Sequence, residues 1–145
     1  KEIWFTDHGP MGGDEVNILK KGANYGWPLA TFGVDYDGAV VSDKSSAQGM
    51  EDPVTHWTPS IAACAAEFSN SALFSHWQNN LLIGALGFEE LRRLTIENKQ
   101  VIGQEVLLKG FGRVRDVKFS PDGALYVVLN RPAKILRIVP VSDSN

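Results

Sequence analysis

The sequence repeats a pair of apolar strands, and the second pair follows the first by about 44 residues, from Leu81 to Leu125. Residues 81–85 and 91–94 (LLIGA, LRRL) have the same form and spacing as residues 125–129 and 135–138 (LYVVL, ILRI). A period of roughly 40–50 residues with up to four strands per unit is typical of β-propeller blades. On the repeat alone, a sandwich of antiparallel sheets would fit equally well.

The rest of the chain also predicts an all-β protein. Apolar segments are short, and Gly, Pro, Asp and Asn turns separate them. No segment keeps a helical apolar period, although one helical turn is expected near residues 71–76, and residues 20–53 are rich in loops. The expected strands span residues 2–6, 15–19, 63–68, 80–85, 91–96, 101–108, 114–119, 124–129 and 135–139.

Composition excludes several classes of protein. The 145 residues are 43% hydrophobic and 21% charged, as expected of a folded globular chain. A formal net charge of -3 and the absence of a Lys/Arg cluster argue against a nucleic-acid surface. No apolar run approaches the roughly 20 residues that span a bilayer. Cys64 is the only cysteine, so an internal disulfide is excluded.

The stretch DHGPMGGDEVN, residues 7–17, carries the first candidate site. Four of the five residues from Gly9 to Gly13 are Gly or Pro, which frees backbone carbonyls from sheet pairing. Asp14 and Glu15 follow directly and add the hard oxygen ligands that Ca²⁺ prefers. The alternative is an ordinary hairpin loop with acidic residues on its solvated rim.

Two arginines form the second candidate site. Arg113 and Arg115 flank Val114 in an expected strand, so alternation would place both guanidinium groups on one face. Two such groups suit the bidentate recognition of carboxylates. The alternative is a solvated strand face on which the arginines pair with Asp116 or another acid.

Taken together, DHGPMGGDEVN, GANYGWP, GVDYDG, HWTPSIA, NNLLIGAL and GRVRDVKFSPDGALYV resemble the glucose/sorbosone dehydrogenase family, the PQQ-dependent soluble aldose sugar dehydrogenases. The resemblance extends over about residues 3–140. It implies a six-bladed β-propeller with four-stranded antiparallel blades, of which this chain would be about half the ring. Residues 1–145 would then be the C-terminal part of a longer protein, without a separate second domain.

The strand count agrees with a partial ring: one unit lacks its first strand, one is complete and one has three strands. In closed propellers the missing outer strand of the last blade commonly comes from the N-terminal end. The isolated segment would expose strand edges, so we expect it to associate with itself or with the missing half.

The resemblance also implies a site for PQQ and Ca²⁺. The carbonyls of Gly9 and Pro10 would coordinate the Ca²⁺ beside PQQ, while Glu15 and the carbonyl of Tyr25 would hold a second, structural Ca²⁺. The base histidine is expected upstream of this segment, so no catalytic residue is assigned here and His8 is expected to pack or cap locally. Some relatives have a lysine near residues 85–87, but this chain has none between Lys44 and Lys99. The residues expected to contact PQQ are Gly9, Pro10, Tyr36, Ala85, Leu86, Gly87, Arg113 and Arg115.

The implied function is oxidation of an aldose at C1 to a lactone by the full-length protein, with transfer of electrons to an external acceptor. The family further implies a periplasmic or secreted protein, and the isolated fragment is expected to be inactive. Two alternatives stay open. One is a non-catalytic, calcium-stabilised propeller that binds carbohydrate or protein, and the other is a generic carbohydrate-binding β domain.

Overall fold

The computed structural model describes residues 2–141, which form short strands and a single 3₁₀ helix. The predicted all-β class is therefore confirmed. In chain order the elements are β1 (Trp4–Asp7), β2 (Asp14–Ile18), β3 (Thr55–Trp57), β4 (Ala63–Phe68), η1 (Ala72–Trp77), β5 (Leu81–Ala85), β6 (Glu90–Glu97), β7 (Gln100–Lys109), β8 (Arg113–Phe119), β9 (Leu125–Asn130) and β10 (Lys134–Ile138).

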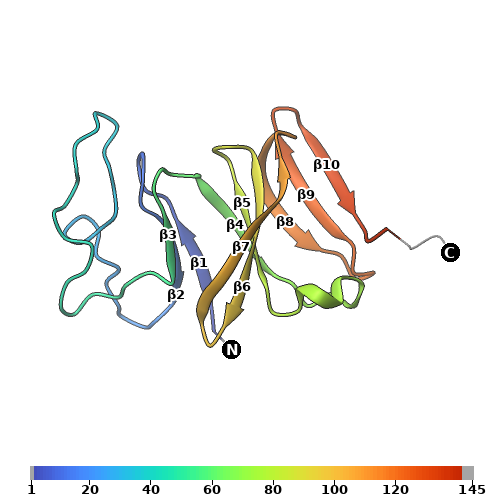
Figure 1. Ribbon diagram of the computed structural model, residues 1–145, viewed down its shortest axis with the longest axis horizontal. Helices are drawn as coiled ribbons and strands as arrows, with labels where there is room; N and C mark the ends of the chain where they lie inside the picture. The colour runs from blue at the N-terminus through green and yellow to red at the C-terminus, as the bar shows by residue number, and fades with distance from the viewer. Residues whose placement is uncertain (1, 142–145) are drawn as a thin grey trace. The chain divides into compact units, whose positions relative to one another are not determined.

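The strands form three antiparallel sheets, with the orders β1-β2-β3, β4-β5-β6-β7 and β10-β9-β8 (Figure 1). Neighbouring strands in each sheet are also consecutive in the chain, as in the blades of a propeller. The incomplete, complete and three-stranded units expected from the repeat correspond to these sheets, and the fold is part of a β-propeller. By its internal contacts the chain divides into two compact units, Lys1–Cys64 and Ala65–Asn145.

The first unit consists of the β1-β2-β3 sheet and a long loop between β2 and β3. Backbone hydrogen bonds and isolated bridges organise this loop. Met11 N donates to Val34 O at 2.8 Å, and Val34 forms bridges with Gly12 and Val40. Strand β3 was not predicted, because its three residues lie between Pro53 and Pro59 and are too few to show an alternating pattern.

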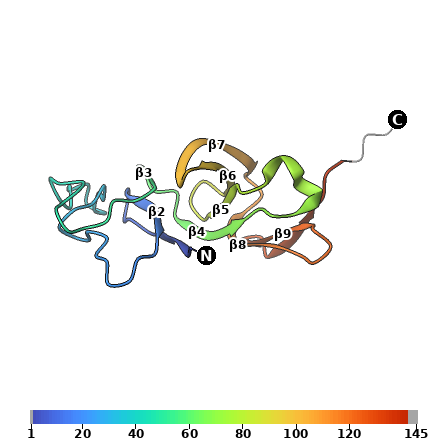
Figure 2. The same ribbon diagram turned by 90° about the horizontal axis from the view of Figure 1, so that it is seen from below.

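The second unit contains the other two sheets, and Figure 2 shows β4, β5, β6 and β7 side by side in that order. Strand β8 packs against β5. At their contact a Cβ on Gly84 would lie only 2.7 Å from Val114 Cγ1, so the close approach requires glycine.

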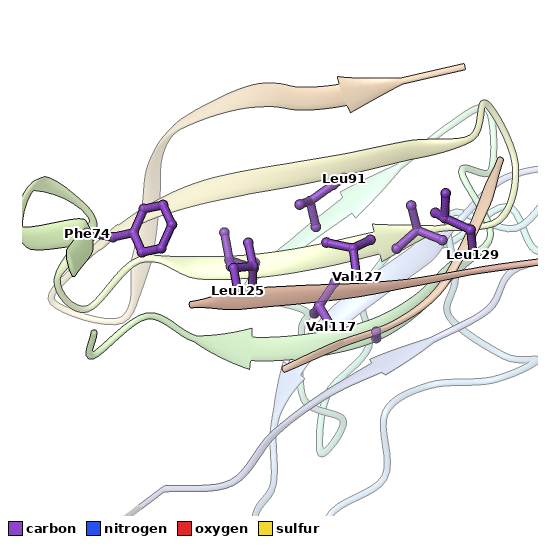
Figure 3. Close-up of a cluster of buried hydrophobic side chains, with 9 residues drawn as sticks. Phe74, Leu91, Val117, Leu125, Val127 and Leu129 are labelled. Atoms are coloured by element: carbon purple, nitrogen blue, oxygen red, sulfur yellow. The ribbon is translucent and has the colours of Figure 1, made fainter. Parts of the chain in front are cut away.

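An apolar cluster between these sheets forms the core of the second unit (Figure 3). Strands β4, β5, β6, β8 and β9 contribute buried side chains to it. Their apolar segments were predicted within one or two residues of their observed ends, because short apolar runs bounded by turns are a local signal. Burial of each Leu or Val side chain contributes about 1.5–3 kcal/mol. The fully assembled cluster contains Ala65, Phe74, Leu82, Leu91, Val114, Val117, Leu125, Val127 and Leu129.

Helix η1 confirms the predicted helical turn and closes one end of this core. Ser71 caps the helix, since its side-chain oxygen accepts from Leu73 N at 3.2 Å. Phe74 stacks on Trp77 with ring centroids 4.6 Å apart and reaches the apolar cluster.

Candidate functional site

The loop between β1 and β2 is held in place by the buried carboxylate of Asp14. Its Oδ1 accepts from Gly9 N and from Ser60 Oγ, both at 2.8 Å, and its Oδ2 accepts from Ala63 N at 3.0 Å. Asp14 has no exposed surface. Both oxygens of Asp14 accept hydrogen bonds from the protein, so this carboxylate holds the loop in place.

The same loop requires glycine at position 9. A Cβ there would lie 1.8 Å from Gly12 O, so no other residue fits this turn. Among the backbone amides of residues 2–141, none donates to the carbonyl oxygens of Gly9 or Pro10. The carbonyl oxygens of Gly9 and Pro10 therefore lie outside the sheet ladder and are available as backbone ligands for a cation.

Glu15 borders a cavity of about 280 Å³ within the first unit. The side chain is 7% exposed, and burial raises the pKa of its carboxyl above 4.5. The Asn17 amide donates to Glu15 Oε2 at 3.0 Å and opposes this shift, while the charges of Asp7 and Asp52 add to it. Glu15 is thus a desolvated carboxylate, and none of the ion pairs that the structure describes involves it.

Asn17 is a residue that sequence reasoning missed. It is fully buried, and its Oδ1 has no hydrogen-bond partner. Asn17 lies two residues beyond Glu15 on β2, so both side chains belong to the same face of the strand. The alternation of side chains along the strand segment DEVNI, which places Glu15 and Asn17 on one face, could have indicated Asn17. A buried acceptor without a donor is costly, which makes this oxygen a candidate ligand.

Tyr25 lines the same cavity as Glu15, so the structure brings these two predicted metal residues together. The Tyr25 hydroxyl donates to Ile18 O and accepts from Lys20 N, both at 2.9 Å, which anchors the residue to the end of β2. His8 is exposed and borders the cavity, rather than packing or capping. No cluster of three or more His, Cys, Asp or Glu side chains suited to a metal occurs in the described part of the chain.

Tyr36 lies in the long loop of the first unit and is 78% exposed. Its backbone N–H donates to Asp35 Oδ1 at 2.7 Å. The alternative of a core aromatic is thereby excluded, and a contact with PQQ stays a prediction.

Arg113 and Arg115 begin strand β8 in the second unit. Arg113 Nε is buried and has no hydrogen-bond partner, whereas the side chain of Arg115 is exposed. The register of β8 against β9 shifts between Val114 and Asp116, which marks a β-bulge at Arg115. The alternation of buried and exposed side chains along β8 therefore breaks after Val114, and the next core residue of the strand is Val117.

The predicted contact segment 85–87 follows the end of β5. Ala85 is fully buried and Leu86 is 7% exposed, so Gly87 is the partly accessible residue of the three. The Ala85–Glu90 pair closes the ladder between β5 and β6. Glu90 is buried in turn and accepts from Lys109 Nζ at 2.8 Å and from Arg92 Nε at 2.8 Å.

Comparison with known proteins decides the family. Residues 1–137 match the model of the Glucose / Sorbosone dehydrogenase family. The chain belongs to this family. It is 39% identical over 142 residues to aldose sugar dehydrogenase YliI of Escherichia coli (strain K12), which covers 95% of this chain and 38% of that relative.

Solved structures support the same assignment. A crystal structure of a glucose dehydrogenase matches with a TM-score of 0.90 and 40% sequence identity. The match covers 97% of this chain and 42% of the glucose dehydrogenase chain. The PQQ-bound aldose sugar dehydrogenase from Streptomyces coelicolor shares the fold, with a TM-score of 0.65 and 24% identity over 88% of this chain and 34% of its own. This family member thus spans about two fifths of the length of such relatives. Within residues 2–141, no helix is long and apolar enough to cross a membrane.

Proposed function

We propose that the full-length protein oxidises aldose sugars at C1 to lactones with PQQ and Ca²⁺, and that this segment supplies part of the cofactor site. The observation that carries the proposal is the buried, unpartnered Nε of Arg113 in a chain of the glucose/sorbosone dehydrogenase family. The related Streptomyces coelicolor protein, which has the same fold, binds PQQ.

The donor chemistry of β8 fits PQQ, an ortho-quinone that carries three carboxylates. A buried guanidinium N–H without an acceptor favours an anionic ligand, because an unsatisfied buried donor is costly. Arg113 would bind a carboxylate from this position, and Arg115 would bind a second one from the bulge. The bound cofactor supplies the electron-accepting quinone, and the base that takes the C1 hydroxyl proton is expected upstream of this segment.

In the proposed site, the first unit would hold two Ca²⁺ ions. The carbonyls of Gly9 and Pro10 would hold one ion, and that ion would supply Lewis-acid polarisation of the quinone of PQQ. Glu15, the Tyr25 carbonyl and Asn17 Oδ1 would hold the structural ion, since Glu15 and Tyr25 share a cavity and the Asn17 oxygen has no donor. Contacts of PQQ with Tyr36 and with residues 85–87 complete the proposed site.

The proposal includes the remaining features of the family. The substrate is a small aldose, electrons leave to an external acceptor, and the protein is periplasmic or secreted. The segment alone lacks the base and is proposed to be inactive, and it would associate with itself or with the other half of the propeller.

The proposal is tested by PQQ titration of the full-length apoprotein in Ca²⁺, followed by absorbance and by recovered sugar oxidation. Loss of a partly desolvated charged hydrogen bond costs about 1.5–3 kcal/mol, so Arg113→Ala and Arg115→Ala should each weaken PQQ binding roughly tenfold to a hundredfold. Arg115→Lys keeps the charge but loses the fork and should fall between the wild type and alanine.

Arg137→Ala is the matched control, because this exposed arginine pairs with Asp122 on another part of the unit. It should bind PQQ like the wild type. If Arg113→Ala and Arg115→Ala also titrate like the wild type, the proposed clamp is wrong. A full-length wild type that takes up no PQQ in Ca²⁺ would instead support the non-catalytic binding propeller.

A further inference from the structure

Asp14 has a fully buried carboxylate to which three neutral groups donate hydrogen bonds. The donors are the backbone amides of Gly9 and Ala63 and the hydroxyl of Ser60. The Ser60 oxygen itself accepts from Ala62 N at 3.1 Å, so its own proton is left for the carboxylate. Three donors around one side chain require a group that only accepts, as an ionised carboxylate does. An amide at this position would set an N–H group against at least one of them.

The turn after β1 is anchored on both sides of the two candidate ligand carbonyls. On the upstream side, Gly9 N donates to Asp14 Oδ1 at 2.8 Å. On the downstream side, Met11 N donates to Val34 O at 2.8 Å. The carbonyl groups of Gly9 and Pro10 lie between these two anchors in the chain.

The downstream anchor is sufficient to orient the carbonyl of Pro10. Pro10 C=O and Met11 N–H belong to one planar trans peptide unit, in which the two groups point in opposite directions. Because Met11 N–H points at Val34 O, the Pro10 oxygen points away from Val34.

The carbonyl of Gly9 depends on Asp14 instead. The Gly9 N–H and the Gly9 carbonyl belong to different peptide units, which are joined by the two dihedral angles of a glycine, the residue with the widest conformational freedom. Space requires the glycine, since a Cβ would lie 1.8 Å from Gly12 O. The turn therefore combines a residue that is free to rotate with a buried carboxylate that holds its amide.

We infer that Asp14 is a positioning residue for the cation of the proposed cofactor site. It holds the Gly9 amide so that the Gly9 and Pro10 carbonyls face the ion together, and it does not coordinate the ion itself. The inference rests on the proposed function and deepens it by assigning the residue that orders these ligands. A turn that is ordered in advance loses less conformational entropy when the ion binds, so its affinity for the cation is higher.

The test follows the turn by NMR of the full-length protein in the presence of PQQ. Carbonyl-¹³C proline and ¹⁵N methionine label the peptide unit of Pro10 and Met11, the only Pro-Met step in this chain, and Met11→Leu identifies its resonance by removing it. Addition of Ca²⁺ should move the Pro10 carbonyl resonance of the wild type saturably. In Asp14→Asn the dissociation constant for Ca²⁺ should rise roughly tenfold, as expected for loss of a hydrogen bond to a charged group.

Two further variants separate positioning from a general loss of stability. Glu90→Gln is the matched control, because it makes the same carboxylate-to-amide change at a buried, hydrogen-bonded glutamate of the second unit. It should lower stability and leave the Ca²⁺ titration of Pro10 unchanged. Ser60→Ala removes one of the three donors but keeps the carboxylate of Asp14, and it should raise the dissociation constant about threefold.

Sugar oxidation provides a second measurement. The Ca²⁺ concentration that gives half-maximal activity should rise roughly tenfold in Asp14→Asn, while the KM for the sugar stays unchanged. Wild-type Ca²⁺ affinity in Asp14→Asn would overturn the inference. If Asp14→Asn does not fold, wild-type affinity in Ser60→Ala would overturn it. A wild type whose Pro10 resonance does not respond to Ca²⁺ would refute the proposed ion at this turn, and the inference with it.

Discussion

Two buried glutamates in the two units of this chain have opposite electrostatic environments. Glu90 is 1% exposed and contacts two cations, Lys109 and Arg92. Burial alone would raise its pKa, but hydrogen bonds from both cations outweigh burial and lower it. Glu15 is 7% exposed, burial raises its pKa, and the side chain that donates to it is the neutral amide of Asn17.

This difference shows that the two units compensate their buried carboxylates in different ways. The second unit compensates its buried carboxylate with its own side chains and has a large apolar core. The first unit buries several polar groups around one loop and provides no cation for Glu15 among its described ion pairs. A buried carboxylate without a cationic partner and a buried carbonyl oxygen without a donor are the features expected of a unit that an external cation completes. The buried polar residues of the first unit are Asp14, Glu15, Asn17 and Thr31.

The largest effect should come from the apolar core of the second unit. Leu91→Ala removes a fully buried side chain and should lower the free energy of unfolding by about 2–5 kcal/mol. Urea denaturation of the full-length protein measures the loss, and hydrogen exchange should locate it in peptides of residues 65–141. Faster exchange confined to residues 2–64 would contradict the assignment of Leu91 to the core of the second unit.

Calcium should stabilise the first unit by a similar amount. A cation at one hundred times its dissociation constant raises the free energy of unfolding by about 2.7 kcal/mol. Glu15→Gln should reduce this gain, as measured by thermal midpoints in Ca²⁺ and in chelator. Glu105→Gln is the control, because this half-exposed carboxylate pairs with Arg93 in the second unit. Equal midpoints in all samples would rule out the structural Ca²⁺ at Glu15.

A smaller, pH-dependent effect is expected at Glu90. Glu90→Gln removes charged hydrogen bonds to Lys109 and Arg92 and should cost about 1–3 kcal/mol at pH 7. The folded pKa of Glu90 lies below its ordinary value of 4.5, so its contribution is present above pH 4.5 and is lost as the pH falls through the folded pKa. Denaturation of both proteins between pH 7 and pH 3 should therefore show the difference shrinking on acidification. A difference independent of pH would show that the charge of Glu90 does not stabilise the fold.

The smallest effect should occur at Asp122. Hydrogen bonds from Ser120 and Arg137, followed by the Ala124 amide, lower its pKa to about 2, yet the side chain is exposed to solvent. Solvent and salt screen such a pair, so Asp122→Asn should lower the thermal midpoint less than Glu90→Gln. Any loss of stability in Asp122→Asn should be present at a pH above 3.8, the ordinary pKa of the group, and should vanish as the pH falls towards 2. A midpoint shift larger than that of Glu90→Gln would reverse this order.

Sequence alone was sufficient for much of the fold. Strand β4 was predicted with its observed bounds, and the strands of the second unit within one or two residues, because apolar alternation and Gly/Asp turns are local signals. The family resemblance was likewise carried by contiguous motifs such as GRVRDV, and the family match over residues 1–137 confirmed it. Strand β3 was missed because its pairing with β2 is a long-range contact that three residues cannot encode locally.

Tertiary structure decided the roles of the charged residues. DE at positions 14 and 15 looked like two equivalent ligands, but strand alternation directs Asp14 to the backbone amides of Gly9 and Ala63 and Glu15 to the cavity. The bulge at Arg115 depends on register with β9, and the buried Nε of Arg113 depends on what packs around it. Which cation neutralises a carboxylate is set by contacts between residues distant in the chain, and for this reason the sequence did not indicate that Glu90 pairs with Lys109.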